Sequence, residues 1–546
     1  MTKQYRSEME SGPKISRRLV LRNGILVASS VAAGLWKPAA AQTAPTIDFY
    51  IGPNGSDSNP GTASSPWAIT ALNTKRSTYA GKTVGFLDGT YDVSGIAPNR
   101  AFEQPIFNIS GGSAGSPTII KSVNPRRAHI TAKASNGDYT GMNGSGACEG
   151  GIFGHIPGSG VASGNIVFDG LKMSGTKDCL IRIGVLPDST NVNYIRGAIV
   201  QNCELFDTNA VGTQPGQNYC AITLHANDGT IIRNNYIHDI VSVFGTTSAD
   251  HVSGTIQWGC INMIYEYNTY IRCGYGPYAK EGFGNGQYGA IIRYNYMDCR
   301  GYGSSGSGGI VDFAGDNSTV APSDSVLLIH NNVIIAGTPL KLRSVFGWSQ
   351  RTQTKTIDIH NNTLIIDTAV GMAGGIGIMF QSYNPGARIY NNVFWGDNDL
   401  SVATAFYEFG YCVISNGPHQ VFDYNAYPNN YAKWTRFSNG QSPYDTGAAT
   451  SSSSLTAWRT SLAAVGSAPA EARETNSFQI TNPMFVGTGT NADKYKLQSG
   501  SPLRNAGRVG GTSSGAAVDV GAWAGATRIG HYFGLTPMNP SAQPVT

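Results

Sequence analysis

Between residues 201 and 427 the chain alternates apolar and polar positions in short runs that are broken by Gly, Asn and Ser. Examples are residues 230–237, Thr-Ile-Ile-Arg-Asn-Asn-Tyr-Ile, and residues 325–335, Ser-Val-Leu-Leu-Ile-His-Asn-Asn-Val-Ile-Ile. Alternation of period two among β-branched and aromatic residues predicts short strands. Helical periodicity is nearly absent after the first fifty residues. One short helix is predicted at 455–465, with Ser454 placed to cap its start.

A repeated Asn sets the spacing of these runs. It recurs at steps of 33, 33, 27, 37, 30, 30 and 33 residues, at Asn202, Asn235, Asn268, Asn295, Asn332, Asn362, Asn392 and Asn425. A repeat near thirty residues without helices predicts the stacked coils of a parallel β-helix. Helical repeats of this length need amphipathic helices, and a propeller blade has four antiparallel strands. We expect a structural Asn that tolerates a left-handed corner and whose amide bonds a neighbouring coil.

Phrases at both ends of the repeat region carry a family resemblance. They are Asp-Phe-Tyr-Ile-Gly-Pro-Asn-Gly-Ser-Asp at 48–57, Asn-Pro-Gly-Thr at 59–62, Asn-Pro-Met-Phe-Val at 482–486, and the segments 497–503 and 518–523. Over residues 48–525 the chain resembles the right-handed parallel β-helix superfamily of pectate-lyase-like proteins. The resemblance implies an all-β, single-stranded right-handed parallel β-helix, a solenoid with terminal caps and loop insertions. These phrases are specific for the fold and weak for the reaction.

The pattern divides the chain into four parts. Residues 1–41 read as a Tat-type signal peptide, with Arg17-Arg18, an apolar stretch to Trp36 and three Ala residues before Gln42. The apolar run is too short for a spanning helix, which needs about twenty residues. We expect the β-helix at 42–430, a loop-rich insertion at 431–480, and a segment at 481–546 that caps the open end. The protein is therefore expected to be periplasmic or secreted, with no membrane span in its mature form.

Removing the leader changes the charge of the chain. The leader holds seven of the 38 Lys and Arg residues and two of the 34 Asp and Glu residues, which leaves 31 basic against 32 acidic residues. The formal net charge falls from +4 to −1, so binding to nucleic acid has no electrostatic support. We expect a monomer. The eight cysteines contain no Cys-x-x-Cys pair, and buried thiols such as Cys273 and Cys299 are expected in place of a zinc site or disulfides.

A second strand follows the repeated Asn in most coils and carries charged residues. Side chains alternate between the two faces of a strand. If Ile181, Leu224 and Ala279 face the core, their neighbours form an outward stripe of Arg182, His225, Lys280, Asp312 and Lys341 or Arg343. Successive coils lie about 4.8 Å apart, so one sugar unit would span one or two coils. Cations, a carboxylate and aromatic residues such as Tyr278 favour an acidic polysaccharide as the partner.

This stripe is a candidate site for β-elimination on a uronate. The reaction needs neutralisation of the sugar carboxylate, a base for the C5 proton and assistance to the departing oxygen. We predict a catalytic set of Lys280, Arg343 and His225. The predicted substrate-binding residues are Arg182, Lys341, Tyr278 and Arg293. Oxygen ligands for Ca²⁺, the candidate cofactor, are expected from Asp312, Asp316 and Glu281.

The local sequence around Lys280 also resembles that of polysaccharide lyase family six, the alginate and dermatan lyases. That family places a catalytic Lys shortly before an Arg-x-Asn phrase, which corresponds here to Arg293-Tyr294-Asn295. The resemblance implies that Lys280 is the base. The chain departs from the family at Glu281, where the family has Ser, and at residues 311–313, where Val-Asp-Phe stands near the place of the family's Arg-His-Gly.

Three other functions remain open from the sequence. A polygalacturonase-like hydrolase needs an adjacent Asp-Asp pair, and the chain has none. A non-catalytic carbohydrate-binding or envelope protein would use the same stripe for adhesion. A C5-epimerase would share the proton abstraction and omit the elimination. Outside the stripe, His238-Asp239 is interpreted as a turn pair, and His330 and His360, at one repeat position, as an outward ladder.

Overall fold

The computed structural model describes residues 46–532, apart from several internal segments. Those segments are 97–103, 136–150, 159–163, 177–178, 186–192, 210–217, 242–250, 274, 281–287, 300–308, 314–325, 337–343, 349–355, 367–374, 381–386, 397–406, 415–420, 430–433, 438–448, 453, 464–473 and 490. The described residues belong to one compact unit, Pro45–Pro537. No helix among them is long and apolar enough to cross a membrane.

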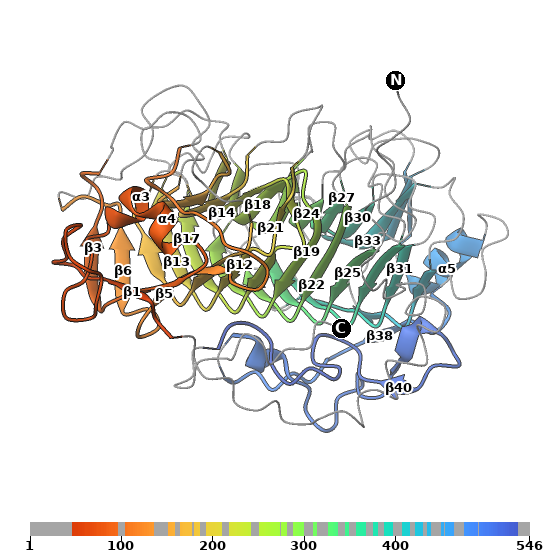
Figure 1. Ribbon diagram of the computed structural model, residues 1–546. Helices are drawn as coiled ribbons and strands as arrows, with labels where there is room; N and C mark the ends of the chain where they lie inside the picture. The colour runs from red at the N-terminus through yellow and green to blue at the C-terminus, as the bar shows by residue number, and fades with distance from the viewer. Residues whose placement is uncertain are drawn as a thin grey trace, which may run out of the picture. The chain divides into compact units, whose positions relative to one another are not determined.

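Three long sheets, which we call A, B and C, make up the fold (Figure 1). Sheet A contains β1 (Phe49–Ile51), β2 (Thr83–Phe86), β5 (Thr118–Ser122), β8 (Ile166–Asp169), β12 (Ile199–Gln201), β16 (Ile231–Arg233), β19 (Ile261–Glu266), β22 (Tyr288–Arg293), β25 (Val326–His330), β28 (Thr356–His360), β31 (Ala387–Tyr390) and β34 (Val421–Asp423), with the short β11 (Ile195–Arg196) and β15 (Asn227–Asp228) beside them.

Sheet C contains β3 (Gly89–Asp92), β6 (Ala128–Thr131), β9 (Lys172–Ser174), β13 (Glu204–Asn209), β17 (Tyr236–Val241), β20 (Thr269–Cys273), β23 (Tyr296–Asp298), β26 (Val333–Ala336), β29 (Thr363–Ile366), β32 (Val393–Gly396), β35 (Ala426–Pro428) and β38 (Phe478–Ile480). Sheet B contains β4 (Phe107–Asn108), β7 (Phe153–His155), β10 (Ile181–Ile183), β14 (Asn218–His225), β18 (His251–Trp258), β21 (Tyr275–Lys280), β24 (Gly309–Phe313), β27 (Ser344–Trp348), β30 (Gly375–Phe380), β33 (Tyr407–Ile414), β36 (Trp434–Phe437) and β37 (Ala449–Ser452).

In the Asn-marked region the chain visits the sheets in the order A, C, B and then starts the next coil. Thus β16 of sheet A is followed by β17 of sheet C and β18 of sheet B, and β19 returns to sheet A. Neighbouring coils pair in parallel, as β16 does with β19 and β17 with β20. The described pairs of the three sheets are parallel except β36 with β37. This pairing is that of a parallel β-helix, which confirms the predicted fold class.

Apolar side chains fill the space between the three sheets. Ile181, Leu224 and Ala279 are buried in the main core cluster, as the alternation along their strands predicts. Burial of such side chains at about 25 cal/mol per Å² of apolar surface is the main stabilising contribution in each coil. Cys273 and Cys299 are buried thiols, as expected.

Seven of the repeated Asn residues form a continuous buried ladder. They are Asn235, Asn268, Asn295, Asn332, Asn362, Asn392 and Asn425, all fully buried. Asn268 Nδ2 donates to Asn295 Oδ1 at 3.1 Å, and Asn295 Nδ2 donates to Asn332 Oδ1 at 3.0 Å. The main-chain N–H of Asn268 shares the same acceptor at 2.9 Å. The predicted amide ladder is confirmed.

The eighth residue, Asn202, lies outside the ladder. Cys203 occupies its place, and its main-chain N–H donates to Asn235 Oδ1 at 3.0 Å. Asn202 instead has a φ of 57°, and left-handed values recur at the residue before each ladder Asn, namely Asn234, Tyr267, Tyr294, Asn331, Asn361, Asn391 and Tyr424. The corner conformation and the ladder amide, which we assigned to one residue, are therefore divided between two adjacent residues.

Short helices lie at both ends of the coils. Near the N-terminus, α3 (Ala71–Thr74) and α4 (Arg76–Tyr79) add Leu72 and Tyr79 to the core. At the other end, α5 (Leu455–Ala463) follows β37 and adds Leu455 and Trp458. Ser454 Oγ accepts the N–H of Ala457 at 3.1 Å, so the predicted capped helix is confirmed.

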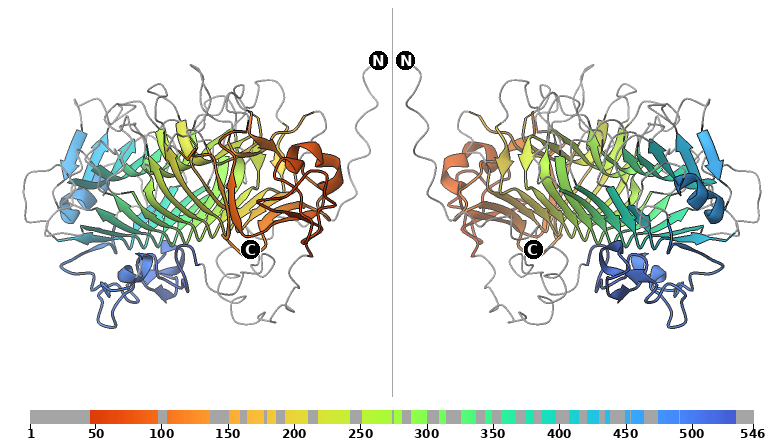
Figure 2. Two further views of the ribbon diagram at one scale, coloured as in Figure 1. Left: turned by 90° about the vertical axis from the view of Figure 1, so that its left-hand side faces the viewer. Right: turned by 90° about the vertical axis from the view of Figure 1, so that its right-hand side faces the viewer.

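The C-terminal segment runs along the side of the coils. We call residues 505–532 the strap; in Figure 2 they are part of the dark blue chain on one side of the coils. Corner amides hold it: Asn391 Nδ2 donates to Arg508 O at 2.8 Å, and Asn361 Nδ2 to Asp519 O at 3.1 Å. It ends beside Asn234, whose Oδ1 accepts the N–H of Tyr532 at 2.9 Å. We expected residues 481–546 to cap the open end of the solenoid; within this segment, the strap lies against the side of the coils.

Candidate functional site

The predicted stripe maps onto the middle strands of sheet B. Strand register places Arg182 beside Thr223, Ile256 beside Tyr278, and Tyr278 beside Asp312. Because Thr223 also pairs with Ile256, these residues form one column across five coils. A second column, two residues along each strand, holds His225, Trp258 and Lys280. The stripe is therefore two adjacent columns, since Arg182 is in register with Thr223 and not with His225.

Arg182 and His225 contact each other beneath the surface. Nη2 of Arg182 lies 3.0 Å from Nδ1 of His225, and Nε donates to Gly184 O at 3.3 Å. A guanidinium has donors only, so Nδ1 of His225 is the acceptor and the ring proton is on Nε2. Both side chains have 0% exposure. We expected both side chains to project outward, Arg182 as a substrate-binding residue and His225 as a catalytic residue; the expected exposure is wrong, and the two roles stay predictions.

An apolar layer on the outer face explains this burial. Cys179, Cys220, Ile256, Trp258 and Tyr278 form a cluster separate from the main core. The ring of His225 meets Trp258 edge to face, with 4.7 Å between centroids. Tyr278, predicted to bind substrate, is 6% exposed within this layer. Sheet B thus carries apolar side chains on both faces at these coils, and its polar residues lie among them.

Several residues of the predicted site cannot be placed in the same detail. Lys280 ends β21 and Asp312 lies in β24, and for both the structure defines the main chain alone. Four further residues, Lys341, Arg343, Glu281 and Asp316, lie outside the described residues. Within the described part of the chain, no group of three or more His, Cys, Asp or Glu residues is arranged to hold a metal ion. The roles of these residues and the Ca²⁺ site stay predictions.

Arg293 lies in a different sheet from the stripe. It ends β22 of sheet A, where Nη2 lies 2.8 Å and Nε 3.0 Å from Glu266 Oε2. The same column of sheet A holds other polar pairs, such as Arg233 with Gln201. The expectation that Arg293 joins Lys280 in one groove is therefore wrong. Each coil turns between sheets B and A, so residues close in sequence project from different sides.

A network of ion pairs and hydrogen bonds lies on the outer face of sheet C, and most of it was not predicted from the sequence. His238 Nδ1 lies 2.6 Å from Asp239 Oδ2, and Nε2 lies 3.7 Å from Glu204 Oε1. The two residues therefore form a pair, but within strand β17 rather than in the predicted turn. Lys172 Nζ lies 3.0 Å from Glu204 Oε1, and Arg272 forms a bidentate pair with Asp239. Lys172 and Glu204 occupy equivalent positions of adjacent coils, and their opposite charges were the signal in the sequence.

The network holds its carboxylates in the ionised form. Burial by itself raises the pKa of Glu204, but its interactions with His238 and Lys172 outweigh that effect and lower the pKa to about 2. The pKa of Asp239 is also lowered, since hydrogen bonds from Arg272 and His238 outweigh its burial. Neither carboxyl group is a proton donor near neutral pH. The network therefore has the properties of a structural ion-pair cluster across neighbouring coils.

Comparisons with known proteins give distant likenesses of fold. No family model and no curated protein matches the chain. Among solved structures, a pectate lyase, Pel9A, is similar with 16% identity and a TM-score of 0.37, over 88% of this chain and 96% of that one. A rhamnogalacturonan lyase is similar with 16% identity and a TM-score of 0.29, over 64% of this chain and 82% of that one. The native form of a GH136 lacto-N-biosidase from Eubacterium ramulus is similar with 11% identity and a TM-score of 0.29, over 71% of this chain and 64% of that one. The parallel β-helix assignment rests on the strand pairing described above.

Proposed function

We propose that this protein is an exported polysaccharide lyase that cleaves an acidic, uronate-containing polysaccharide by β-elimination on sheet B. The register of β14, β18 and β21 supports the proposal, since it brings His225, Trp258 and Lys280 into one column. The adjacent column holds Arg182 and Asp312. Coils about 4.8 Å apart match a glycan whose sugar units each span one or two coils.

In the proposed reaction Lys280 is the base. Its amine takes the C5 proton of the uronate, the bond from C4 to the glycosidic oxygen breaks, and a C4–C5 double bond forms while water donates a proton to the departing oxygen. Charge that develops on the sugar carboxylate is stabilised by a cation, the role proposed for Arg343. A Lys acts as base only when its pKa is lowered, and nearby cations have that effect.

The buried pair Arg182 and His225 lies beneath the outer layer of side chains on this face of sheet B. Arg182 places a permanent positive charge under the outer layer of sheet B, which favours an anionic ligand above it. His225 packs edge to face on Trp258, the neighbour of Lys280 in the column. We propose that both residues position the site and that neither touches the substrate. Ca²⁺ remains the proposed cofactor, with Asp312, Asp316 and Glu281 as its oxygen ligands.

Ultraviolet absorbance of the unsaturated product tests the proposal. The purified protein is incubated with alginate, pectate, glucuronan and bacterial exopolysaccharides, in Ca²⁺ and in a chelator. We expect absorbance on at least one substrate and a loss of about 100-fold or more in Lys280→Ala, the usual range for removal of a catalytic base. Lys82→Ala, an exposed Lys before β2, is the matched control and should keep full activity.

Five outcomes contradict the proposal or its assignment of the base. Absence of absorbance on every substrate removes the lyase assignment, and a fully active Lys280→Ala removes Lys280 as the base. Reducing ends without an unsaturated product indicate a hydrolase, and inverted C5 centres without cleavage indicate an epimerase. Binding without turnover indicates a carbohydrate-binding protein.

A further inference from the structure

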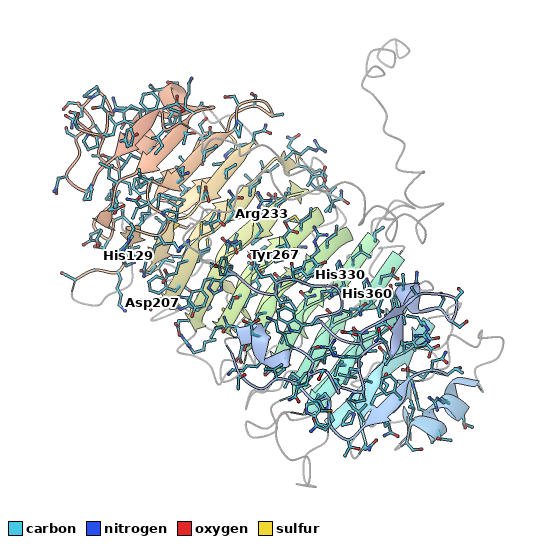
Figure 3. The ribbon with its side chains drawn as sticks, turned by 90° about the horizontal axis from the view of Figure 1, so that it is seen from below. His129, Asp207, Arg233, Tyr267, His330 and His360 are labelled. Atoms are coloured by element: carbon cyan, nitrogen blue, oxygen red, sulfur yellow. The ribbon has the colours of Figure 1, made fainter. Side chains whose placement is uncertain are left out.

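The strap covers a row of stacked rings along one corner of the coils. Tyr267 stacks on Tyr294 at 5.0 Å between centroids, and His330 stacks on His360 at 4.9 Å with 4° between the planes. His360 in turn stacks on Tyr390 at 4.9 Å. Figure 3 shows His330 and His360 side by side on neighbouring strands. The predicted ladder of these two histidines is confirmed, but it lies at the covered corner rather than in open solvent.

Each of these histidines orients the corner Asn that binds the strap. Asn331 Nδ2 donates to the strap carbonyls of Ala522 and Ala524, both at 2.9 Å, which fixes the orientation of its amide. Its Oδ1 lies 2.7 Å from His330 Nδ1, so Nδ1 must carry the proton. His360 repeats the arrangement on Asn361 at 2.9 Å. The phrase His-Asn-Asn thus supplies an orienting imidazole, a strap-binding amide and a ladder amide.

A third imidazole belongs to the strap itself. His531 N–H donates to Thr269 Oγ1 at 3.0 Å, and its ring stacks on Tyr236 with centroids 4.6 Å apart. Arg528, three residues earlier, lies over the ring of Tyr267 at 4.2 Å. The end of the strap therefore adds aromatic, imidazole and cation–π contacts to the apolar packing of Ile529.

Burial keeps these imidazoles neutral. It lowers the pKa of His330 to about 3, together with the charge of His360, and it lowers the pKa of His360. Burial and the charges of Arg126 and His238 lower the pKa of His531 to about 4. The charged and titratable groups around the three rings are mostly cationic: Arg293, Arg388, Arg126, Arg528 and His238, against the carboxylates Asp358 and Glu204. An added proton therefore meets both desolvation and like charge.

We propose that the strap is an acid-released element: protonation of the imidazoles beneath and within it detaches residues 505–532, while the Asn ladder keeps the coils folded. A histidine whose pKa is lower in the bound state stabilises that state fully above its free pKa of about 6.5. This stabilisation is lost as the pH falls below 6.5 toward the bound value. Release exposes apolar residues on the outer face of sheet C, including Val333, Ile335 and Ile365, which pack with Ala522 and Ile529.

The expected size follows from proton linkage. For an imidazole with a free pKa near 6.5 and a bound pKa near 3, the release equilibrium rises about 25-fold between pH 7 and pH 5. His531, with a bound pKa near 4, contributes a factor of similar size. These factors act on the strap alone, because the ladder amides do not titrate.

Amide hydrogen exchange at pH 7 and pH 5, corrected for intrinsic rates, tests the proposal. The strap reporters are Gly521, whose N–H donates to Asn391 O, and Gly530, whose N–H donates to Tyr294 O. The ladder amides of Asn268 and Asn332 are the reference. We expect protection of the strap amides to fall tenfold or more at pH 5 while protection of the ladder amides stays unchanged.

Variants separate titration from packing. H330Q/H360Q/H531Q keeps neutral N–H donors at all three positions and should abolish the pH dependence of strap protection. His129→Gln is the matched control, because His129 lies on β6, bonds to Ser174 and has no contact with the strap among the described residues. If the triple variant folds poorly, His531→Gln alone should reduce the effect. Equal strap protection at both pH values, an unchanged fall in the Gln variants, or parallel loss in the ladder overturns the proposal.

Discussion

Replacement of Asn295 by Ala should test how much the amide ladder stabilises the coils. Asn295 stands in the middle of the ladder and is fully buried. Its Oδ1 accepts the main-chain N–H of Asn268 at 2.9 Å and Nδ2 of the same residue at 3.1 Å. Its own Nδ2 donates to Tyr265 O and Arg293 O, both at 2.9 Å. The substitution removes the side-chain amide and leaves the two donors of Asn268 without their acceptor in a fully buried site.

The expected loss follows from those two stranded donors. A buried polar group without its partner costs about 1–3 kcal/mol, so two of them predict a loss of about 4 kcal/mol in the free energy of unfolding. Single domains are commonly stable by only about 5–15 kcal/mol. The substitution should therefore remove a large part of the free energy of unfolding, although Ala is smaller than Asn and introduces no charge.

Guanidinium unfolding followed by far-ultraviolet circular dichroism measures the change, from the shift in midpoint multiplied by the slope. Asn331→Gly is the matched control. Asn331 is adjacent to the ladder and lies at a corner with φ of 55°, where Gly is unstrained. Its amide bonds only the strap carbonyls and His330 among the described contacts. We expect its loss to cost about 1–2 kcal/mol.

The reasoning fails if Asn295→Ala costs less than about 1 kcal/mol, or no more than Asn331→Gly. Either result would mean that apolar stacking holds the coils and that the ladder amides contribute little beyond register.

Two further predictions concern buried charges. Arg293→Ala should change lyase activity by no more than about twofold, because Arg293 lies in sheet A. It should lower the free energy of unfolding by about 3 kcal/mol, because the nearly buried Glu266 loses its ion-pair partner. Activity assays and unfolding curves measure the two effects, and loss of activity in a folded variant would mean that Arg293 belongs to the site. Burial raises the pKa of Glu474 to about 7, so the folded state holds its proton and stability should fall as the pH rises from about 4.5 to 7. Glu474→Gln should flatten that part of the profile of thermal midpoint against pH, and an unchanged slope would assign the dependence to other groups.

The fold could be predicted because its information is local and repeated. Alternation of apolar residues identified the strands, and the recurrence of Asn gave the coil length. The same alternation placed Ile181, Leu224 and Ala279 in the core. The two roles of the Asn-Asn phrase were not separable in the sequence, because the left-handed corner and the ladder amide are adjacent and differ only in main-chain geometry.

The candidate site was predicted less well. The sequence correctly placed Arg182 and His225 on the face of sheet B opposite the core, but not their burial. His225 packs on Trp258, whose cluster partners Cys179, Ile256 and Tyr278 come from three different coils. Arg293 was predicted to bind substrate because the family resemblance pairs Lys280 with the Arg-x-Asn phrase at 293–295, whereas the connection between β21 and β22 takes it to another sheet.

The sequence by itself therefore determined the parallel β-helix, the core-facing positions and the residue types along sheet B, because a side chain's face follows from strand periodicity alone. Only the tertiary structure decided which outward residues are covered. Covering depends on segments distant in the chain: Asn234 binds Tyr532, and Asn331 binds Ala522 and Ala524. Such contacts depend on where the chain returns in space, and a periodic pattern carries no information about that path.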